Sequence, residues 1–525
     1  MTRLLNRRRT LTAMLTALSL LLPLGASQAG ARSAAARPAV IDQKLLATVA
    51  RGTAPAVLSW DSDVTSRAEV TSYLRSRGVA FQAFSVLPMA IACAATAEDV
   101  LTLSHAPGAV SVYGDEVMAP TVKAGSLPST DRGTAARTPL RVPGVTGDNV
   151  GIAVLDTGVD GNHADLKFGT KTLLNARVVL SHMEFMGPGN EVCAPNQYEE
   201  SIPDTENISG HGTHLAGVAA GDGTASGGSV KGVAPGADLV GVSIVEQSTP
   251  QHLGDISVSL IRFLGGVNYV LTESLEGGPT ITKVVLLGWT SQGLHDPWHP
   301  HTLAISDLHA FGIAPVVPVG NGGSTASRCD QASTCRFNRL AVGNFAIGVG
   351  ATTITPSGPV LADYSSGGDP QLQRGNCGGF PCPDDEPLTR YEPFIMAPGT
   401  NILGARRVGA ATFAGSPNTP YPLAGQGAGA GDDVTNVNYQ SMTGTSVAAA
   451  QVAGSIALMQ QAARDAKGCY LTVDQVQEIL RQTATPMAGY ARWQVGVGSI
   501  DAAAAVVAAR EASRLSSPDS WMCPG

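Results

Sequence analysis

Charged residues are scarce in this 525-residue chain, at 14% against a usual ~25%. Aromatic residues are also few, at 5%, and the formal net charge is -8 without any basic stripe. Nucleic acid is therefore not an expected partner, because domains that bind it carry a clustered basic surface. Hydrophobic residues make up 43% of the chain, so a large core can still be buried.

Long apolar runs are also lacking beyond the N-terminus, so a membrane is not an expected partner either. Residues 1–31 combine a basic start, the apolar run LTAMLTALSLLLPLGA and small residues around Ala29 and Ala31. This pattern is typical of a cleaved signal peptide. We therefore expect a secreted protein, extracellular or periplasmic. The arginines at 7–9 leave the twin-arginine export route open beside the general one.

Eight cysteines fit an oxidising compartment. Zinc binding by these cysteines is disfavoured, because no histidine lies beside them at ligand spacing. Eight cysteines allow 105 connectivities, and the sequence alone does not decide among them. The candidate disulfides are Cys329–Cys335, Cys377–Cys382 and Cys469–Cys523.

The chain divides into segments of different pattern. Residues 32–44 are interpreted as a linker, and the remainder of residues 32–118 predicts a small α+β unit of βαββαβ type. Residues 119–146 form a connector rich in proline, glycine and threonine, which is open to proteolysis. Residues 147–510 alternate strands with helices, and residues 511–525 form a C-terminal tail.

The strands of the larger segment are nearly continuous apolar runs, as in parallel strands buried on both faces. Helical patterns follow them, so we expect an α/β fold with a doubly wound, mostly parallel sheet and helices on both faces. The predicted strands are residues 150–156, 237–245, 283–289, 312–320 and 345–351.

Ser446 lies between a Gly-Thr turn and an alanine-rich helical run. One interpretation is a helix N-cap, because a serine oxygen can accept from the free N–H groups of the first turn. The other is a nucleophile, because the same N–H groups and the positive helix end would stabilise an oxyanion beside that hydroxyl. The stretch alone leaves both open.

Three other positions could serve such a nucleophile. Asp156 ends a buried strand, where it could instead form a simple Asx-turn. His211 starts a helix and could act as the base, although His211 and His214 could also bind a metal as a pair. Asn321 follows a strand among glycines, where its amide could donate to an oxyanion or simply form a turn.

Together these stretches resemble the subtilisin-like serine peptidases, the subtilase family. The similar segments include VLDTGVDGNHADL, HGTHLAGVAAG, PVGNGG, IMAPGTNILGA and YQSMTGTSVAAAQVAG, and the resemblance covers about residues 145–510. It implies that Ser446 is the nucleophile and His211 the general base and acid. It also implies that Asp156 orients the imidazole, and that Asn321 forms the oxyanion hole with the Ser446 backbone N–H.

The sequence departs from the family pattern at several places. Residues 447–451 replace the usual Met-Ala-Ser/Thr-Pro-His run after the serine. The segment 286–293 carries Trp289, which could line the substrate cleft or belong to the core. Residues 178–208 are interpreted as an inserted loop with an exposed acidic stretch, and the histidine-rich residues 295–301 as a rigid surface loop.

The resemblance implies a secreted serine endopeptidase that acts on protein or peptide substrates and is made as a self-processed zymogen. Residues 32–118 would be its inhibitory propeptide, cut in the 119–146 connector. The chemistry would need no cofactor; a structural calcium ion is conceivable, but no ligand set can be assigned. We expect a monomer. The alternative is a proteolytically silent binding or scaffold protein of the same fold.

Overall fold

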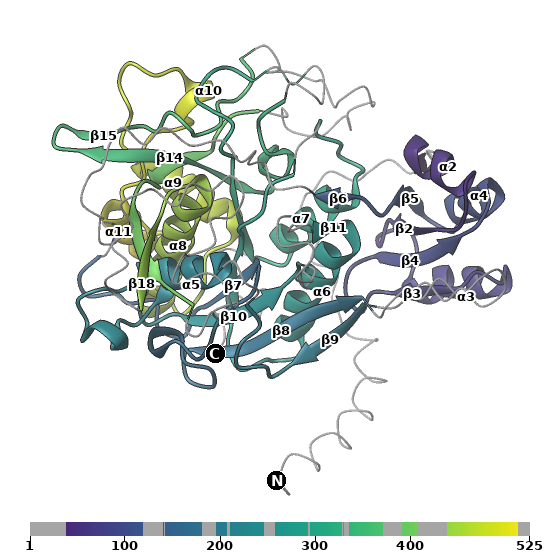
Figure 1. Cartoon of the computed structure of the whole chain (residues 1–525), viewed down its shortest axis with the longest axis horizontal. Helices are drawn as coiled ribbons and strands as arrows, with labels where there is room; N and C mark the ends of the chain where they lie inside the picture. Colours follow the sequence, from purple (N-terminus) through teal and green to yellow (C-terminus); the bar gives the residue numbers. More distant parts are fainter. Residues whose placement is uncertain are drawn as a thin grey trace, which may run out of the picture.

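The computed structural model describes two parts of the chain that pack against each other (Figure 1). The described residues are 38–118, 140, 142–180, 196–206, 210–245, 258–291, 294–327, 329, 335–370, 391–407 and 438–512. Among them, no helix has the length and apolar character needed to cross a membrane. The predictions for residues 1–31, for the 119–146 connector up to residue 139, and for Cys377–Cys382 lie outside the described residues.

The N-terminal unit is a five-stranded sheet covered by helices on one face. Its strand order is β1-β5-β2-β4-β3. Along the chain, the elements from β2 to β5 follow one another in the predicted βαββαβ order. The linker interpretation of residues 32–44 was wrong at its end, because β1 and the start of α2 lie there. The elements are β1 (Val40–Ile41), α2 (Gln43–Val49), β2 (Ala54–Trp60), α3 (Arg67–Ser76), β3 (Phe81–Ala83), β4 (Met89–Ala94), α4 (Ala97–Ser104) and β5 (Ala109–Gly114).

Local sequence signals fix the two longer helices of this unit. Ser66 caps α3 and Thr96 caps α4, and each cap is a reciprocal capping box with the acidic residue three positions on, Glu69 and Asp99. Gly78 follows α3 with a φ of 69°, a left-handed conformation that glycine adopts without steric cost.

The large unit is built on a nine-stranded sheet, with order β15-β14-β13-β12-β7-β10-β8-β9 and β16 beside β14. The central strands pair in parallel, whereas β15 and β9 pair antiparallel at the two edges. This confirms the predicted mostly parallel α/β fold. The strands are β7 (Gly151–Asp156), β8 (Thr172–Leu180), β9 (Asn196–Glu200), β10 (Asp238–Ser243), β12 (Thr282–Leu287), β13 (Ala314–Pro318), β14 (Ile347–Thr355), β15 (Gly358–Leu361) and β16 (Ile395–Pro398).

Helices cover both faces of this sheet, as side-chain alternation along β7 shows. Ile152 and Val154 belong to the core shared with α5, α8, α9 and α11, whereas Ala153 and Leu155 belong to the core shared with α6 and α7. The helices are α5 (His211–Ala220), α6 (Leu260–Leu275), α7 (Pro300–Ala310), α8 (Thr445–Lys467), α9 (Val473–Thr483), α10 (Arg492–Val495) and α11 (Ala502–Glu511), with single 3-10 turns at Ala164–Leu166, Thr224–Ser226 and Arg339–Ala341.

Helix α8 is buried from Thr445 to Ala463, which explains its run of small residues. At Gly454 an added Cβ would lie 2.7 Å from the carbonyl oxygen of Ala219 in α5. The two helices can therefore approach this closely only because that position is glycine. A small hairpin, β17 (Ile402–Ala405) with β18 (Tyr439–Met442), leads into α8.

The N-terminal unit lies against α6 and α7 (Figure 1). Apolar residues on the open face of its sheet, such as Leu87 and Met89, join the same buried cluster as those two helices. A short strand that follows β5, β6 (Val117–Met118), pairs antiparallel with β11 (Val258–Ser259), which directly precedes α6. The last strand of the N-terminal unit is thus hydrogen-bonded to a strand of the large unit.

Two further sequence interpretations can be compared with these elements. The supposed inserted loop at 178–208 begins with the last residues of β8 and contains β9, so the loop interpretation was wrong for those parts. The polar sequence NQYEE of β9 fits an exposed edge strand. The Cys329–Cys335 disulfide is present. Cys469 is also disulfide-bonded, whereas Cys523 lies outside the described residues.

Candidate active site

Asp156 is the last residue of β7, at the carboxyl end of the parallel strands. Its side chain is fully buried, and Oδ1 accepts from the backbone N–H of Thr157 at 2.7 Å and contacts His211 Nδ1 at 2.7 Å. Gly288 lies against the other oxygen, since an added Cβ there would be 2.0 Å from Oδ2. The carboxylate is therefore held between a backbone donor, a histidine and a glycine.

His211 is the first residue of α5, and its ring joins two other predicted residues. Nδ1 faces Asp156, and Nε2 lies 3.0 Å from the Oγ of Ser446. The neutral ring with its proton on Nδ1 would accept the Ser446 hydroxyl proton at Nε2. The three residues come from β7, α5 and α8, and they are 55 and 235 positions apart along the chain.

Two carboxyl groups act on His211. Burial lowers the pKa of its ring, but the charge and hydrogen bond of Asp156 and the charge of Glu206 raise it, and the net direction is upward. Glu206 is itself fully buried. Burial raises the pKa of its carboxyl to about 7, although the hydrogen bonds from Thr157 and Thr213 lower it. The histidine is thus a stronger base than it would be if burial acted alone.

Glu206 also supports the start of α5. The N-cap residue Gly210 has no side chain to offer, and the Oε2 atom of Glu206 accepts instead from the backbone N–H and hydroxyl of Thr213, at 2.8 and 2.7 Å. Sequence reasoning missed this residue, and it placed the acidic stretch 199–207, which contains Glu206, on the surface. That placement was wrong for Glu206, which is 3% exposed.

Ser446 is the second residue of α8, and the cap interpretation of this residue was wrong. The N-cap position is Gly444, where no side chain makes a capping hydrogen bond. The Ser446 hydroxyl is buried against His211 instead, at 4% exposure of the residue. Its backbone N–H lies in the first turn, where N–H groups have no partner within the helix.

Asn321 is anchored by its oxygen to the start of the same helix. Oδ1 accepts from both the backbone N–H and the hydroxyl of Thr445, each at 2.9 Å. This fixes which end of the amide faces outward, so that Nδ2 points away from Thr445. Nδ2 and the Oγ of Ser446 both lie 3.4 Å from the Cβ position that can be built on Gly444. The amide nitrogen of Asn321 and the hydroxyl of Ser446 therefore both lie close to Gly444.

The alternative metal pair at the start of α5 does not form. His211 already contacts Asp156 and Ser446, whereas His214 is fully buried with Nε2 3.1 Å from the backbone oxygen of Ile402. Burial, and then the neighbouring His211, lower the pKa of His214 to about 3. His214 is a neutral core residue.

Other singled-out residues take positions outside this cluster. Trp289 is 6% exposed and belongs to the buried cluster on the α6–α7 side, which favours the core interpretation. Gln451 is buried in α8, where its Nε2 donates to the oxygen of Pro398 at 2.7 Å. The surface-loop interpretation of residues 295–301 was wrong for His299 and His301, which are buried at the start of α7.

One further group of side chains could hold a metal ion. Among the residues that the structure describes, only Glu116, His299 and His301 bring three suitable ligand atoms within 4.8 Å of one another. No second group of this kind is found in that part of the chain.

Comparison with known proteins gives a consistent picture. Residues 147–500 match the model of the Subtilase family. The chain is 27% identical to serine protease AprX of Bacillus subtilis over 64% of this chain and 61% of AprX, and 24% identical to subtilisin DY of Bacillus licheniformis over 70% of this chain and 94% of that protein. The fold is similar to that of fervidolysin from Fervidobacterium pennivorans, which is described as a keratinolytic enzyme related to subtilisin. The TM-score is 0.56 and the sequence identity 20%, and the match covers 87% of this chain and 61% of fervidolysin.

Proposed function

We propose that this chain, which belongs to the subtilase family, is a serine endopeptidase that hydrolyses peptide bonds in proteins through an acyl-enzyme formed on Ser446. The observation that carries the proposal is the continuous contact from Asp156 through His211 to Ser446, at 2.7 and 3.0 Å. These residue types in this geometry form a nucleophile, a base and the group that orients the base.

The reaction follows from these contacts. The Oγ atom of Ser446 attacks the scissile carbonyl carbon while His211 Nε2 takes the hydroxyl proton. Asp156 keeps the ring proton on Nδ1 and stabilises the imidazolium that forms. The protonated His211 then gives its proton to the leaving amine, and a water molecule attacks the acyl-enzyme by the same route in reverse. No cofactor is needed for these steps.

The negative oxygen of the tetrahedral intermediate would be stabilised at the start of α8. The backbone N–H of Ser446 and the Nδ2 of Asn321 are the two donors, and the positive end of the helix lies behind them. Because Asn321 Oδ1 is held by Thr445, the amide does not have to reorient when the charge develops.

The test is hydrolysis of a chromogenic peptide by the wild type and by Ser446→Ala, with Ser455→Ala as a matched control. Ser455 is a second buried serine of α8, and its hydroxyl donates within the helix to Gln451. We expect Ser446→Ala to lose about 10⁶-fold in kcat, as is usual when a triad nucleophile is removed, and Ser455→Ala to stay near the wild type. A wild type that hydrolyses the peptide no faster than the background rate of Ser446→Ala would refute the proposal in favour of the silent scaffold.

We further propose that residues 32–118 act as a propeptide that folds against the catalytic domain. In support, the Oδ1 of Asn268 in α6 accepts from the backbone N–H groups of Val86 and Leu87 at 2.9 and 3.2 Å, and Asp115 accepts from Ile261 at 3.1 Å. Deletion of the segment should strongly lower the yield of active enzyme. A normal yield without it would exclude this role.

Export and processing complete the proposal. The basic and apolar pattern of residues 1–31 supports secretion as a signal-bearing precursor, and the connector at 119–146 is the region for self-cleavage. The N-terminal sequence of the protein recovered outside the producing cells tests both points. It should begin within the connector for the wild type and before residue 40 for Ser446→Ala. The same wild-type start for both variants would exclude self-processing.

A further inference from the structure

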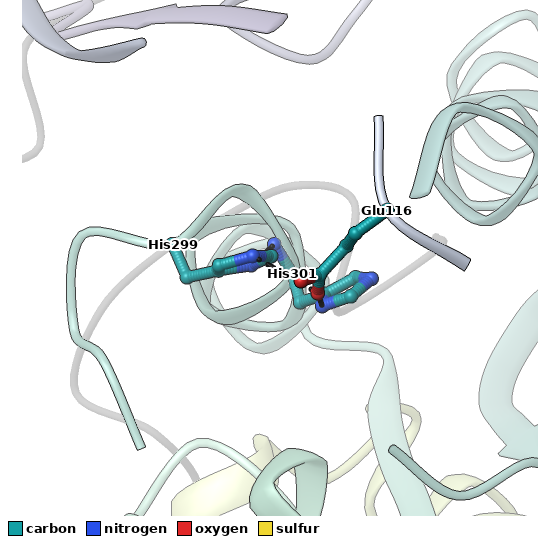
Figure 2. Close-up of side chains that lie close together, drawn as sticks. All are labelled: Glu116, His299 and His301. Carbon is teal, nitrogen blue, oxygen red and sulfur yellow. Dashed lines mark hydrogen bonds and ion pairs between the residues drawn. The ribbon is translucent and has the colours of Figure 1, made fainter. Parts of the chain in front are cut away.

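The start of α7 and the side chain of Arg339 surround the carboxylate of Glu116, which belongs to the N-terminal unit. Nε2 of His299 lies 3.2 Å and Nδ1 of His301 lies 3.8 Å from Glu116 Oε1. Figure 2 shows the carboxylate pointing toward the two rings. The guanidinium of Arg339 contacts the same oxygen and donates through Nε to Ser291 at 2.8 Å.

The side chains around Glu116 are arranged to donate hydrogen bonds to a carboxylate. The Nδ1 atom of His299 accepts from the backbone N–H of His301 at 3.2 Å. A ring nitrogen that accepts a hydrogen bond carries no proton, so the ring of His299 is neutral and has a single proton. With Nδ1 accepting, that proton is on Nε2, the atom that faces Glu116. Arg339, whose side chain is 15% exposed, adds a permanent positive charge.

A metal ion fits the same groups less well. Coordination through His299 Nε2 would move the ring proton to Nδ1 and break the bond from the His301 N–H. The two rings are stacked face to face, with centroids 4.5 Å apart and an angle of 28° between their planes. The charge of Arg339 would also repel a cation.

The site is rigid and walled by aromatic rings. Tyr113 packs edge-on against His299 at 4.7 Å, and Phe263 packs edge-on against His301 at 4.9 Å. Pro300, between the two histidines, occupies the first turn of α7, where its fixed φ suits the helix. Donors held in place in this way lose little freedom when a carboxylate binds.

We propose that His299 and Arg339 form a carboxylate-binding site on the catalytic domain, which holds Glu116 in the full chain and an acidic side chain of a docking peptide after the N-terminal unit has been cleaved away. Three of its nitrogens, Nε2 of His299 and Nδ1 and Nε2 of His301, make no hydrogen bond within the described residues, so the site has capacity for a carboxylate in more than one orientation. The part of the proposal that concerns cleavage rests on the proposed propeptide; the site in the full chain does not.

Acetate is the probe for the full chain. All variants carry Ser446→Ala to prevent self-cleavage. Glu116→Ala should lower the melting temperature, and acetate should restore it with a saturable rise of about 2 °C or more, whereas chloride at equal ionic strength should not. The matched control is Glu199→Ala, which removes the carboxylate of the exposed Arg177 pair and should show no acetate effect.

The same series separates the proposal from its rivals. Addition of Arg339→Gln should abolish the acetate effect. Equal acetate effects in the Glu116→Ala and Glu199→Ala chains would overturn the proposed carboxylate site. Binding of one equivalent of zinc to the parent Ser446→Ala chain, lost when His301 is replaced, would overturn it as well. If Glu116→Ala does not fold, ¹⁵N NMR of the parent chain can instead determine which ring nitrogen of His299 carries the proton. The proposal requires this proton on Nε2, and a proton on Nδ1 would contradict it.

The step after cleavage is tested with the processed, phosphonylated enzyme and a labelled peptide of residues 111–118. The natural peptide should bind at least about tenfold more tightly than its Glu116→Gln version, because a charge-assisted hydrogen bond is lost in the latter. Equal binding would overturn this step. A chain that is never processed would instead refute the proposed zymogen and would leave the acetate result standing.

Discussion

Replacement of Asn321 by aspartate separates the two roles that we propose for this side chain. The oxygen of Asn321 accepts two hydrogen bonds from Thr445, and the amide nitrogen lies near Gly444, as the Ser446 hydroxyl does. Asn321→Asp keeps an acceptor for Thr445 but removes the donor beside Ser446. The helix start should therefore stay in place while stabilisation of the oxyanion is lost.

The expected loss can be estimated from both effects. Removal of one oxyanion donor costs about 10²–10³ in kcat, or about 2.7–4 kcal/mol. An ionised aspartate adds repulsion to the developing charge, of up to ~4 kcal/mol at 4 Å and an effective dielectric constant of 20. We therefore expect kcat to fall by at least about 10³ with little change in KM, because the interaction is made only in the transition state.

The assay is steady-state hydrolysis of a chromogenic peptide together with the melting temperature. Asn321→Leu, which loses donor and acceptor alike, should lower kcat and also stability, by about 1–3 kcal/mol for the groups left unpaired on Thr445. Thr445→Ser, which keeps the hydroxyl, should resemble the wild type. An Asn321→Asp enzyme within threefold of wild-type kcat would show that Asn321 is an ordinary turn residue.

Three further changes test the surroundings of the triad. Because the charge of Glu206 raises the pKa of His211, Glu206→Gln should move the acid limb of the kcat/KM profile to lower pH; an unchanged limb would show that the two groups are not coupled. Gly288→Ala would place a methyl group 2.0 Å from the Asp156 carboxylate and displace it from His211. We expect kcat to fall by about 10⁴, the loss that follows when the acid no longer holds its histidine in the working tautomer; near-normal kinetics would contradict that geometry. Asn268→Ala leaves two backbone N–H groups of the N-terminal unit without their acceptor, at a cost of about 1–3 kcal/mol each, so trypsin should degrade that unit faster in the Ser446→Ala chain, and an unchanged rate would argue against the docking role of Asn268.

The sequence predicted those features that depend on short stretches of chain. The apolar runs of the central strands and the small residues of α8 predicted the sheet and its covering helices, because burial on both faces leaves a mark at each position. Asp156, His211, Asn321 and Ser446 were each ambiguous alone. They became a candidate site only as a set, and the structure brings Asp156, His211 and Ser446 into direct contact.

Features set by distant contacts could not be predicted in this way. Glu206 belongs to an acidic stretch that looks exposed, and its burial depends on Thr213 at the start of α5. The histidines at 299 and 301 lie among prolines, as in a surface loop, and are buried with Glu116 of the N-terminal unit close by. Strand β9 was missed because an edge strand needs no apolar alternation.

The central claim is that Ser446 is a nucleophile activated by His211. Its most direct test is the mass of the protein after reaction with a serine-directed phosphonyl probe, with brief trypsin treatment to remove the N-terminal unit. We predict one adduct, located on Ser446, in the wild type and none in Ser446→Ala. A wild type that stays unlabelled after trypsin, or an equal adduct in Ser446→Ala, would contradict the account.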